Sequence, residues 1–537
     1  MTDAWGWSGP GRPATSADAL ERAIHDVARP VFVVETPEGV AVATDGALSA
    51  TPRHRLLAAA GPVDPGGLGS AAFRGDHGVR AASMAGAMAG GIASVELVSA
   101  LARAGHLASY GAAGQLPERI DEAVRRIREA APGRPFAVNV IHSPSEAALE
   151  EGVVDVLLHR DVRLVEASAY LELTEPLVRY RLTGAHRDGQ GRVRGRNRVI
   201  AKVSRPETAR LFLAPAPEAL VRRLRDRGAI TEEEAALAPS LPMADDITVE
   251  ADSGGHTDRR PLLPLLSSIL VLRDRLAPGL GTTPRVGAAG GLGTPHAIAA
   301  AFAMGAEYVV TGSVNQSCVE SGTSDAARSM LVAAGIADFA MAPAADMFEL
   351  GVELQVLRKG TMFPMRAARL SALYRAHDSL DDLGEDDRAW LERTVLRAPV
   401  EAVWESCVEY FTRRDPDQLL RARDHPKRRM ALVFRWYLGM ASRWAAVGDA
   451  ERAADYQIWA GPALGAFNDW VAGTALARPE ERRVALVTDV LLGGAAVMMR
   501  KSILTAGGIR SGPVDPQRLL DAHAAAHAAA TTGGSRS

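Results

Sequence analysis

The sequence predicts a closed barrel of eight parallel strands, each followed by a helix, which is the (β/α)8 or TIM barrel. Short apolar runs alternate with helical patterns from residue 77 to about residue 325, and buried parallel strands typically show such runs. About eight strand–helix units over about 250 residues is the size of this barrel. An open doubly wound sheet is the alternative, and it fits less well because no G-x-G-x-x-G follows the first strand.

The eight expected strands are the apolar runs between which helical spacing recurs. They cover residues 79–84, 107–110, 136–142, 164–167, 198–203, 247–251, 285–289 and 308–311. Glycines follow the last two strands at once, as Gly290-Gly291 after Ala289 and as Gly312-Ser313. Glycine lets a backbone approach a ligand closely, and TIM barrels build phosphate sites from the turns after these two strands. The pair of turns therefore indicates a site for one phosphate group, with tight packing turns as the alternative.

Four regions are expected along the chain. Residues 1–75 form a small unit with a helix that starts near Ser16, a hairpin that turns at residues 37–39, and a linker. The barrel covers 76–340, with a helical insertion at 206–242 after the fifth strand. We interpret that insertion as a cover over the active-site face or, equally, as a decoration without function. Residues 341–510 form a helical region for a substrate or partner, and 511–537 form a disordered tail.

Composition restricts the functional classes. The 537 residues are 47% hydrophobic and carry a formal net charge of −3, which does not suggest a nucleic-acid-binding protein. No uncharged apolar run reaches about 18 residues and the first residues do not resemble a signal peptide, so we expect a cytoplasmic protein without a membrane span. Two cysteines, Cys318 and Cys407, exclude a disulfide framework. His523 and His527 lack an acidic third ligand nearby, and no metal site is expected.

A Ser253-Gly254-Gly255-His256 sequence follows the sixth strand and is the most informative short motif. A histidine at the carboxyl end of a barrel strand points into the active-site mouth, and its pKa range suits proton transfer. A structural histidine is the alternative interpretation.

Two polar residues interrupt otherwise apolar strands. Asn139 needs hydrogen-bond partners, which a ligand or neighbouring backbone would supply, and Lys202 is costly to bury unless it meets an anion or an electron-rich ring. Residues 83–86 are mostly small and allow close backbone contact at the end of the first strand. Motifs for a P-loop, a nucleophile elbow and a zinc protease are absent. The chemistry is therefore expected from an organic cofactor, or from histidine and backbone alone.

Longer motifs give the chain a family resemblance over residues 70–475. They include MAGAMAGGIAS, FAVNVIHSPSEAALEEG, NRVIAKVSRPE, ADSGGHTD, RVGAAGGLGTPHA and DYQIWAGPALGAFNDWV. These resemble the trans-acting enoyl reductase subunit of polyunsaturated fatty acid and polyketide synthases, within a superfamily of nitronate monooxygenases and flavin-dependent enoyl reductases. The resemblance implies a barrel that binds one FMN, with NADPH or NADH as the electron donor.

The resemblance also assigns residues by position. It places the FMN phosphate on the turns after the last two strands, the flavin ring against the other strand ends, and His256 beside the flavin as the catalytic residue. The residues implied in FMN binding are Met84, Ala85, Gly86, Asn139, Lys202, Ser253, Gly254, Gly255, Ala289, Gly290, Gly291, Gly312 and Ser313.

The function that the resemblance implies is reduction of enoyl thioesters carried by an acyl carrier protein. A nitronate monooxygenase-like flavin oxidase and a non-catalytic flavin-binding synthase subunit are the alternatives. The acyl chain, the choice between NADPH and NADH, and homodimer formation stay open. The basic cluster at Lys427, Arg428 and Arg429 is a candidate contact for the acidic carrier protein, and a solvated helix face is the alternative.

Overall fold

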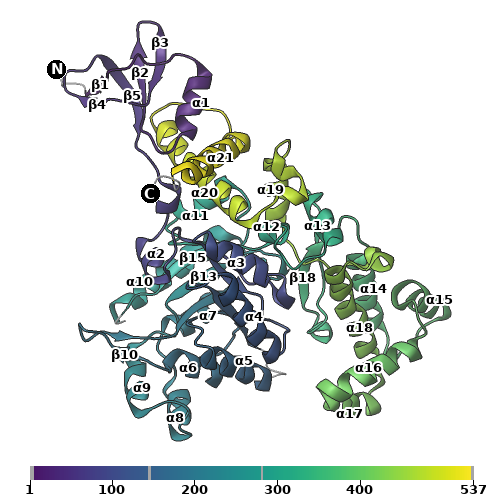
Figure 1. Cartoon of the computed structure of the whole chain (residues 1–537). Helices are drawn as coiled ribbons and strands as arrows, with labels where there is room; N and C mark the ends of the chain where they lie inside the picture. The colour runs from purple at the N-terminus through teal and green to yellow at the C-terminus, as the bar shows by residue number, and fades with distance from the viewer. Residues whose placement is uncertain (1–4, 143–146, 280–281, 534–537) are drawn as a thin grey trace. The chain divides into compact units, whose positions relative to one another are not determined.

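A computed structural model describes residues 5–142, 147–279 and 282–533 of the chain. It divides into two compact units (Figure 1). The first comprises residues 1–250, 261–321 and 470–537, and the second comprises residues 251–260 and 322–469.

The first unit contains the predicted barrel, which is closed by eight parallel strands in the order β12-β13-β15-β16-β6-β7-β8-β9. The last of these pairs with the first, since Val165 of β9 lies opposite Val199 of β12. The closed ring confirms the (β/α)8 fold and excludes the open sheet. The strands are β6 (Ser83–Ala85), β7 (Leu107–Tyr110), β8 (Ala137–Ile141), β9 (Leu164–Ser168), β12 (Arg198–Val203), β13 (Asp246–Glu250), β15 (Arg285–Ala289) and β16 (Val309–Thr311).

A helix follows each barrel strand. Most of these helices show one apolar face, as in α4, where Ile120, Ala123, Val124 and Ile127 are buried at helical spacing. In strand order the helices are α3 (Val95–Arg103), α4 (Pro117–Ala130), α5 (Ala147–His159), α6 (Glu175–Leu182), α7 (Pro206–Leu213), α10 (Leu262–Leu276), α11 (Pro295–Ala303) and α12 (Ser313–Gln316).

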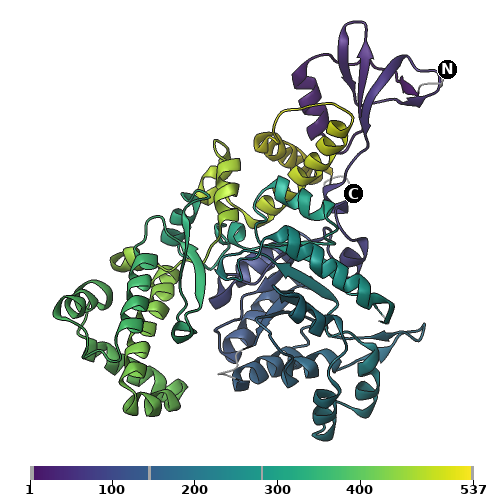
Figure 2. The ribbon, with the colours of Figure 1, turned by 180° about the vertical axis from the view of Figure 1, so that it is seen from behind.

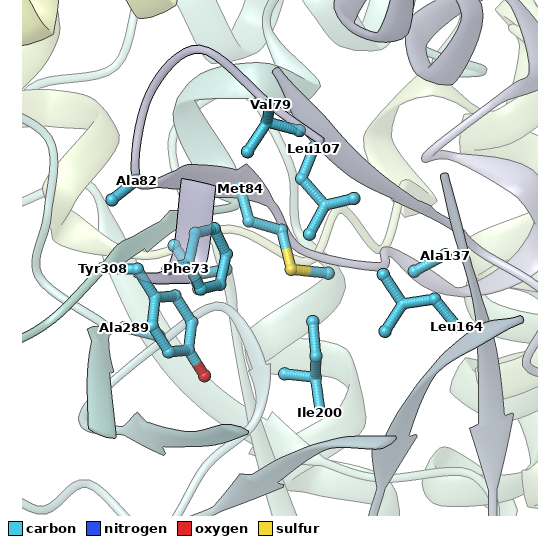
Figure 3. Close-up of a cluster of buried hydrophobic side chains, with 11 residues drawn as sticks. Phe73, Val79, Ala82, Met84, Leu107, Ala137, Leu164, Ile200, Ala289 and Tyr308 are labelled. Atoms are coloured by element: carbon cyan, nitrogen blue, oxygen red, sulfur yellow. The ribbon is translucent and has the colours of Figure 1, made fainter. Parts of the chain in front are cut away.

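The apolar core of the barrel lies toward the amino ends of the strands, where α2 (Ala71–His77) packs against it through Phe73. The ring of Phe73 on α2 stacks on Tyr308 with the ring centroids 4.5 Å apart. Figure 3 shows both rings with the other side chains of this core. His77 Nε2 lies 2.8 Å from Oδ2 of Asp246, the first residue of β13. Arg285 Nε donates to the other carboxylate oxygen at 2.6 Å.

Asp246→Asn is expected to destabilise the fold by about 3 kcal/mol, because it breaks a buried ion pair on one side only. Burial alone would raise the pKa of Asp246. The hydrogen bond from His77 and the charges of His77 and Arg285 lower the pKa by more than burial raises it, so the net shift is downward. This contribution is complete above the unfolded-state pKa of about 3.9 and is lost as pH falls through the lower folded-state pKa. Urea unfolding of the wild type and of Asp246→Asn at pH 7 and pH 3 measures this contribution. An equal loss of unfolding free energy in the variant at both pH values would contradict the ion-pair explanation.

The insertion after the fifth strand does not cover the active-site face. It begins after α7 and returns to β13, and Asp245 N–H donates to Val199 O at the start of β12. Its base therefore lies at the amino ends of the strands. The insertion is helical, as predicted, and contains α8 (Glu218–Asp226) and α9 (Glu232–Leu237), the second of which begins with a capping box at Thr231.

These insertion helices pack on the outer side of α6 (Figure 1). Arg223 of α8 pairs with Glu175 of α6 at 2.5 Å, and Glu234 of α9 accepts from Gly184 N–H just beyond the other end of α6. The interpretation as a lid is therefore wrong. The sequence pattern located the insertion but assigned it to the loop after the strand, whereas the chain first completes α7.

The N-terminal residues form a five-stranded sheet in the order β3-β2-β5-β1-β4, with Trp7 fully buried. The predicted hairpin is β2 and β3, and the predicted helix is α1, capped by the Ser16 side chain. The elements are β1 (Gly6–Ser8), α1 (Ala17–His25), β2 (Val31–Thr36), β3 (Gly39–Ala43), β4 (Ala47–Ser49) and β5 (His54–Ala60).

Two C-terminal helices complete the first unit, α20 (Val484–Ala506) and α21 (Pro516–Gly533). Both views show them beside the N-terminal sheet (Figures 1 and 2). The buried Arg500 of α20 donates to the carbonyl of Arg29 at 2.8 Å. Most of the segment expected to be a disordered tail is thus the helix α21, anchored by the buried Val514 and Leu519. Residues 534–537 of that tail lie outside the described residues.

The second unit combines a three-stranded antiparallel sheet, in the order β14-β18-β17, with helices. Its strands are β14 (Gly255–His256), β17 (Phe339–Pro343) and β18 (Glu353–Leu357). Its helices are α13 (Asp325–Val332), α14 (Phe363–Ala376), α15 (Glu385–Trp390), α16 (Val400–Arg414), α17 (Pro416–Asp424), α18 (Pro426–Val447) and α19 (Pro462–Trp470), the last of which ends at the unit boundary. No described helix has the length and apolar character required to cross a membrane.

Candidate active site

The two glycine turns lie side by side at the carboxyl ends of β15 and β16. These strands pair in parallel, with Ala289 opposite Val310. Gly290 and Gly291 both have positive φ, 83° and 74°, which favours glycine. A Cβ placed on Gly291 or on Gly312 would meet no atom within 4 Å. The space beside Gly291 and Gly312 is open, so these turns have room for a ligand.

The end of β6 is fixed against its neighbours by main-chain hydrogen bonds. Gly86 N–H donates to Thr311 O at 3.0 Å, and a Cβ on Gly86 would lie only 3.0 Å from Val310. The next N–H, that of Ala87, donates to Glu166 Oε2 at 2.8 Å. The segment is thus a backbone surface without room for a larger side chain at Gly86. Met84, which the resemblance placed at the cofactor, turns its side chain into the buried core.

Lys202 lies between two carboxylates inside the barrel. Its Nζ is 3.1 Å from Glu250 Oε1. Burial lowers the pKa of Lys202, but Glu250 and Glu166 outweigh it and the net shift is upward, so the ammonium is retained. Burial raises the pKa of Glu166, whose side chain is wholly inaccessible, although the charge of Lys202 opposes that shift. Of the two partners that the sequence left open for Lys202, an anion or an electron-rich ring, the protein itself supplies the anion as Glu250, with Glu166 as a second acidic neighbour.

Asn139 already has partners within the protein. Its Nδ2 donates to Glu166 O at 2.9 Å and to Ser168 Oγ at 3.1 Å. Of the two sources of partners that the sequence left open, the neighbouring strand supplies those for the amide nitrogen. Glu166 and Ser168 are polar residues two positions apart on β9, and both face inward. Sequence reasoning missed this signal.

In the second unit, the loop 251–260 continues the chain directly from Glu250, the last residue of β13. Its glycines pack against protein, since a Cβ on Gly254 would lie 2.6 Å from the Cα of Ala460 and one on Gly255, at φ 79°, would lie 3.0 Å from Trp459. The paired glycines therefore have a packing role within this unit, which the interpretation as a ligand surface did not include. Ser253 precedes them, and its N–H donates to Thr257 Oγ1 at 3.3 Å.

His256 lies on β14, opposite Leu354 of β18. Its Nε2 is 3.3 Å from Oδ1 of the exposed Asp346, and its ring packs edge-on against Trp459 at 5.4 Å. Its Nδ1 is buried and has no hydrogen-bond partner among the residues that the structure describes. The imidazole is held firmly in place and retains an unused nitrogen.

A second histidine lies in a Ser–His–Asp arrangement, as in a hydrolase triad, but a substrate could not reach it. Ser83 Oγ lies 3.1 Å from His106 Nδ1, and His106 Nε2 lies 2.9 Å from Asp489 Oδ1 on α20. Ser83 and His106 are both buried. Burial raises the pKa of Asp489, but His106 and Arg80 lower it to a net downward shift. This network joins α20 to the barrel and does not form a nucleophilic site.

A closed parallel barrel of this topology defines a TIM-barrel protein, and the open glycine turns at the carboxyl ends of β15 and β16 are its candidate ligand site. The chain belongs to the nitronate monooxygenase family, whose profile matches residues 81–372. A second profile, the inserted helical domain of [acyl-carrier-protein] S-malonyltransferase, matches residues 377–456 in the second unit.

Among solved structures, the enoyl reductase domain of MlnA from the macrolactin biosynthesis cluster of Bacillus amyloliquefaciens is 37% identical. The match has a TM-score of 0.79 and covers 82% of this chain and 99% of that one. A polyunsaturated fatty acid synthase polypeptide of Thraustochytrium sp. is 45% identical over 82% of this chain, and the polyketide biosynthesis protein PksE of Bacillus subtilis is 41% identical over 81%. The chain spans only 30% and 57% of the lengths of these two relatives. The predicted resemblance to enoyl reductases of such synthases is confirmed.

Proposed function

We propose that this protein is an FMN-dependent enoyl reductase that acts in trans on enoyl thioesters carried by the acyl carrier protein of a polyunsaturated fatty acid or polyketide synthase. The observation that carries the proposal is the pair of adjacent glycine turns with open space beside them, in a chain that covers 99% of an enoyl reductase domain. NADPH or NADH is the proposed electron donor.

The residues at the barrel mouth fit FMN. The turns at Gly290, Gly291 and Gly312, with Ser313, would hold the phosphate through main-chain N–H groups, and space is open beside Gly291 and Gly312. Around the ring, the proposal places Ala85, Gly86, Asn139 and Lys202 of the first unit, and the family resemblance adds Gly254 and Gly255 of the second.

Bound FMN would supply hydride transfer from NAD(P)H to the β-carbon of the enoyl thioester. The chain's own residues then have three tasks. The glycine turns hold and orient the cofactor. Lys202 supplies fixed positive charge beside its electron-rich ring. His256 delivers a proton to the α-carbon of the substrate, or holds the water that does so.

The helical part of the second unit is the proposed surface for the carrier protein, because its profile is that of a domain from an acyl-carrier-protein transferase. The predicted basic cluster is partly engaged within the protein. Lys427 pairs with Asp378 at 2.9 Å, Arg428 pairs with Glu349, and Arg429 lies over the Trp404 ring. Lys427 and its neighbours are therefore a weaker candidate for carrier docking than the sequence suggested.

A nitronate monooxygenase-like oxidase is the second candidate, favoured by the family profile over residues 81–372. Product analysis separates the two functions. With NADPH and crotonyl-pantetheine, a reductase forms butyryl-pantetheine at the same rate with and without oxygen. Oxygen-dependent consumption of a nitronate without butyryl product would support the oxidase. A yellow protein that binds FMN and does neither would be the non-catalytic subunit.

A further inference from the structure

His142 occupies a defined position at the rim of the barrel. It directly follows β8, and its main-chain N–H donates to Ser168 O at the end of β9 at 3.2 Å. The same Ser168 accepts from Asn139 through its side chain. His142 is thus fixed to two neighbouring strands at their carboxyl ends, which is where TIM barrels place their ligands.

Glu150 of α5 orients the imidazole of His142. One carboxylate oxygen lies 3.3 Å from His142 Nδ1. The other accepts hydrogen bonds from Tyr170, at 2.7 Å, and from the Thr174 hydroxyl. A carboxylate that accepts from two hydroxyls has only acceptor capacity to offer the imidazole, so Nδ1 carries the hydrogen. The arrangement keeps a hydrogen on Nδ1 and fixes the direction of the ring.

Tyr170 also packs against the imidazole of His142. Its ring stacks on that of His142, with centroids 5.4 Å apart and an interplanar angle of 23°. Ala169, the residue before it, adopts a φ of 62°, a left-handed conformation that costs a non-glycine residue free energy. Burial, followed by the charge of Glu150, raises the pKa of Tyr170 well above its usual value, so the phenol remains a donor.

Of His142, Glu150 and Tyr170, only His142 is partly exposed. The side chain of His142 is 12% exposed, whereas that of Glu150 is 3% exposed. Within the described part of the chain, His142 Nε2 makes no hydrogen bond. A buried carboxylate is costly, and here it holds a ring whose second nitrogen is available to a ligand.

We propose that His142 contacts the substrate and donates a hydrogen bond from Nε2 to the carbonyl oxygen of the acyl thioester, with Glu150 and Tyr170 as positioning residues. This inference rests on the proposed function. An imidazole that donates from both nitrogens is a cation, and Glu150 is its counter-ion. The thioester oxygen gains negative charge while the β-carbon is reduced, so a charged donor there stabilises the transition state more than the ground state.

Binding of two inert ligands to the oxidised holoprotein tests the proposal. Butyryl-pantetheine has the thioester carbonyl, and S-butyl-pantetheine has a methylene in its place. By isothermal titration, His142→Leu should weaken binding of the thioester about tenfold, the effect of losing one charge-assisted hydrogen bond, and leave thioether binding unchanged. Glu150→Gln should show a smaller loss, again confined to the thioester. His159→Gln, at an exposed position on the same helix, is the matched control and should bind both ligands normally.

An equal loss for both ligands in His142→Leu, or no loss for either, would overturn the assignment. If the leucine variant has a lowered melting temperature, His142→Gln keeps an N–H donor, and it should retain part of the preference for the thioester. Absence of that preference in His142→Gln would also overturn it. If the wild-type holoprotein binds neither ligand and NADPH with crotonyl-pantetheine gives no butyryl product, the proposed function itself fails, and this assignment fails with it.

Discussion

His256→Ala is expected to leave FMN binding and reduction by NADPH intact while slowing reduction of an enoyl thioester by about 10²- to 10⁴-fold, the range for a positioned acid–base group. The physical reason is that the imidazole ring of His256 is held in one position by its neighbours. β14 pairing, the Trp459 edge and Asp346 fix the imidazole, and its Nδ1 has no partner within the described residues. Stopped-flow absorbance separates the two half-reactions and measures each rate.

The control for this variant is His186→Ala, because His186 is an exposed histidine on β10 (His186–Arg187) at the amino-terminal side of β12. It should not change either half-reaction. Unchanged reoxidation in His256→Ala would remove the role proposed for His256. Slowed reduction by NADPH together with slowed reoxidation would instead indicate a disturbed cofactor site.

Gly312→Val is expected to weaken FMN binding by at least about a hundredfold, since a branched side chain would fill the space proposed for the phosphate. The fold should tolerate the change. A Cβ at Gly312 meets no protein atom within 4 Å, and its φ of −131° lies outside the positive range that favours glycine. Fluorescence titration of the apoprotein with FMN measures the dissociation constant, and thermal unfolding of the apoprotein reports the fold.

Gly189→Val is the matched control, because a Cβ there also meets nothing within 4 Å and the residue lies in the turn between β10 and β11 (Val193–Arg194). That variant should bind FMN normally. Normal FMN affinity in Gly312→Val would show that the phosphate does not bind at the turn after β16.

The barrel was largely predictable because its strands are buried on both faces. Each is a short apolar run, and 198–203 and 285–289 match the observed β12 and β15 residue for residue. The N-terminal sheet was less predictable, since β1 and β4 have only three residues each and are defined by long-range pairing with each other. The place of the insertion also depended on tertiary structure, because no local pattern distinguishes a loop at the carboxyl end of a strand from one at the amino end.

The candidate site was predictable where a residue violates its local pattern. Lys202 interrupts an apolar strand, and paired glycines interrupt periodic segments, so both stood out. Glu166 also interrupts an apolar run and could have been found in the same way. The His142 arrangement could not, because Glu150 and Tyr170 reach it from α5 and from the loop after β9. Only the closed barrel brings these residues together.

The central claim is tested most directly by a single turnover without oxygen. The yellow holoprotein is bleached with one equivalent of NADPH and then mixed with an enoyl thioester on its carrier protein. The account predicts that the flavin absorbance returns with the formation of one saturated thioester per flavin. A flavin that stays bleached in the presence of the enoyl thioester, and regains its colour only when oxygen is admitted, would contradict it.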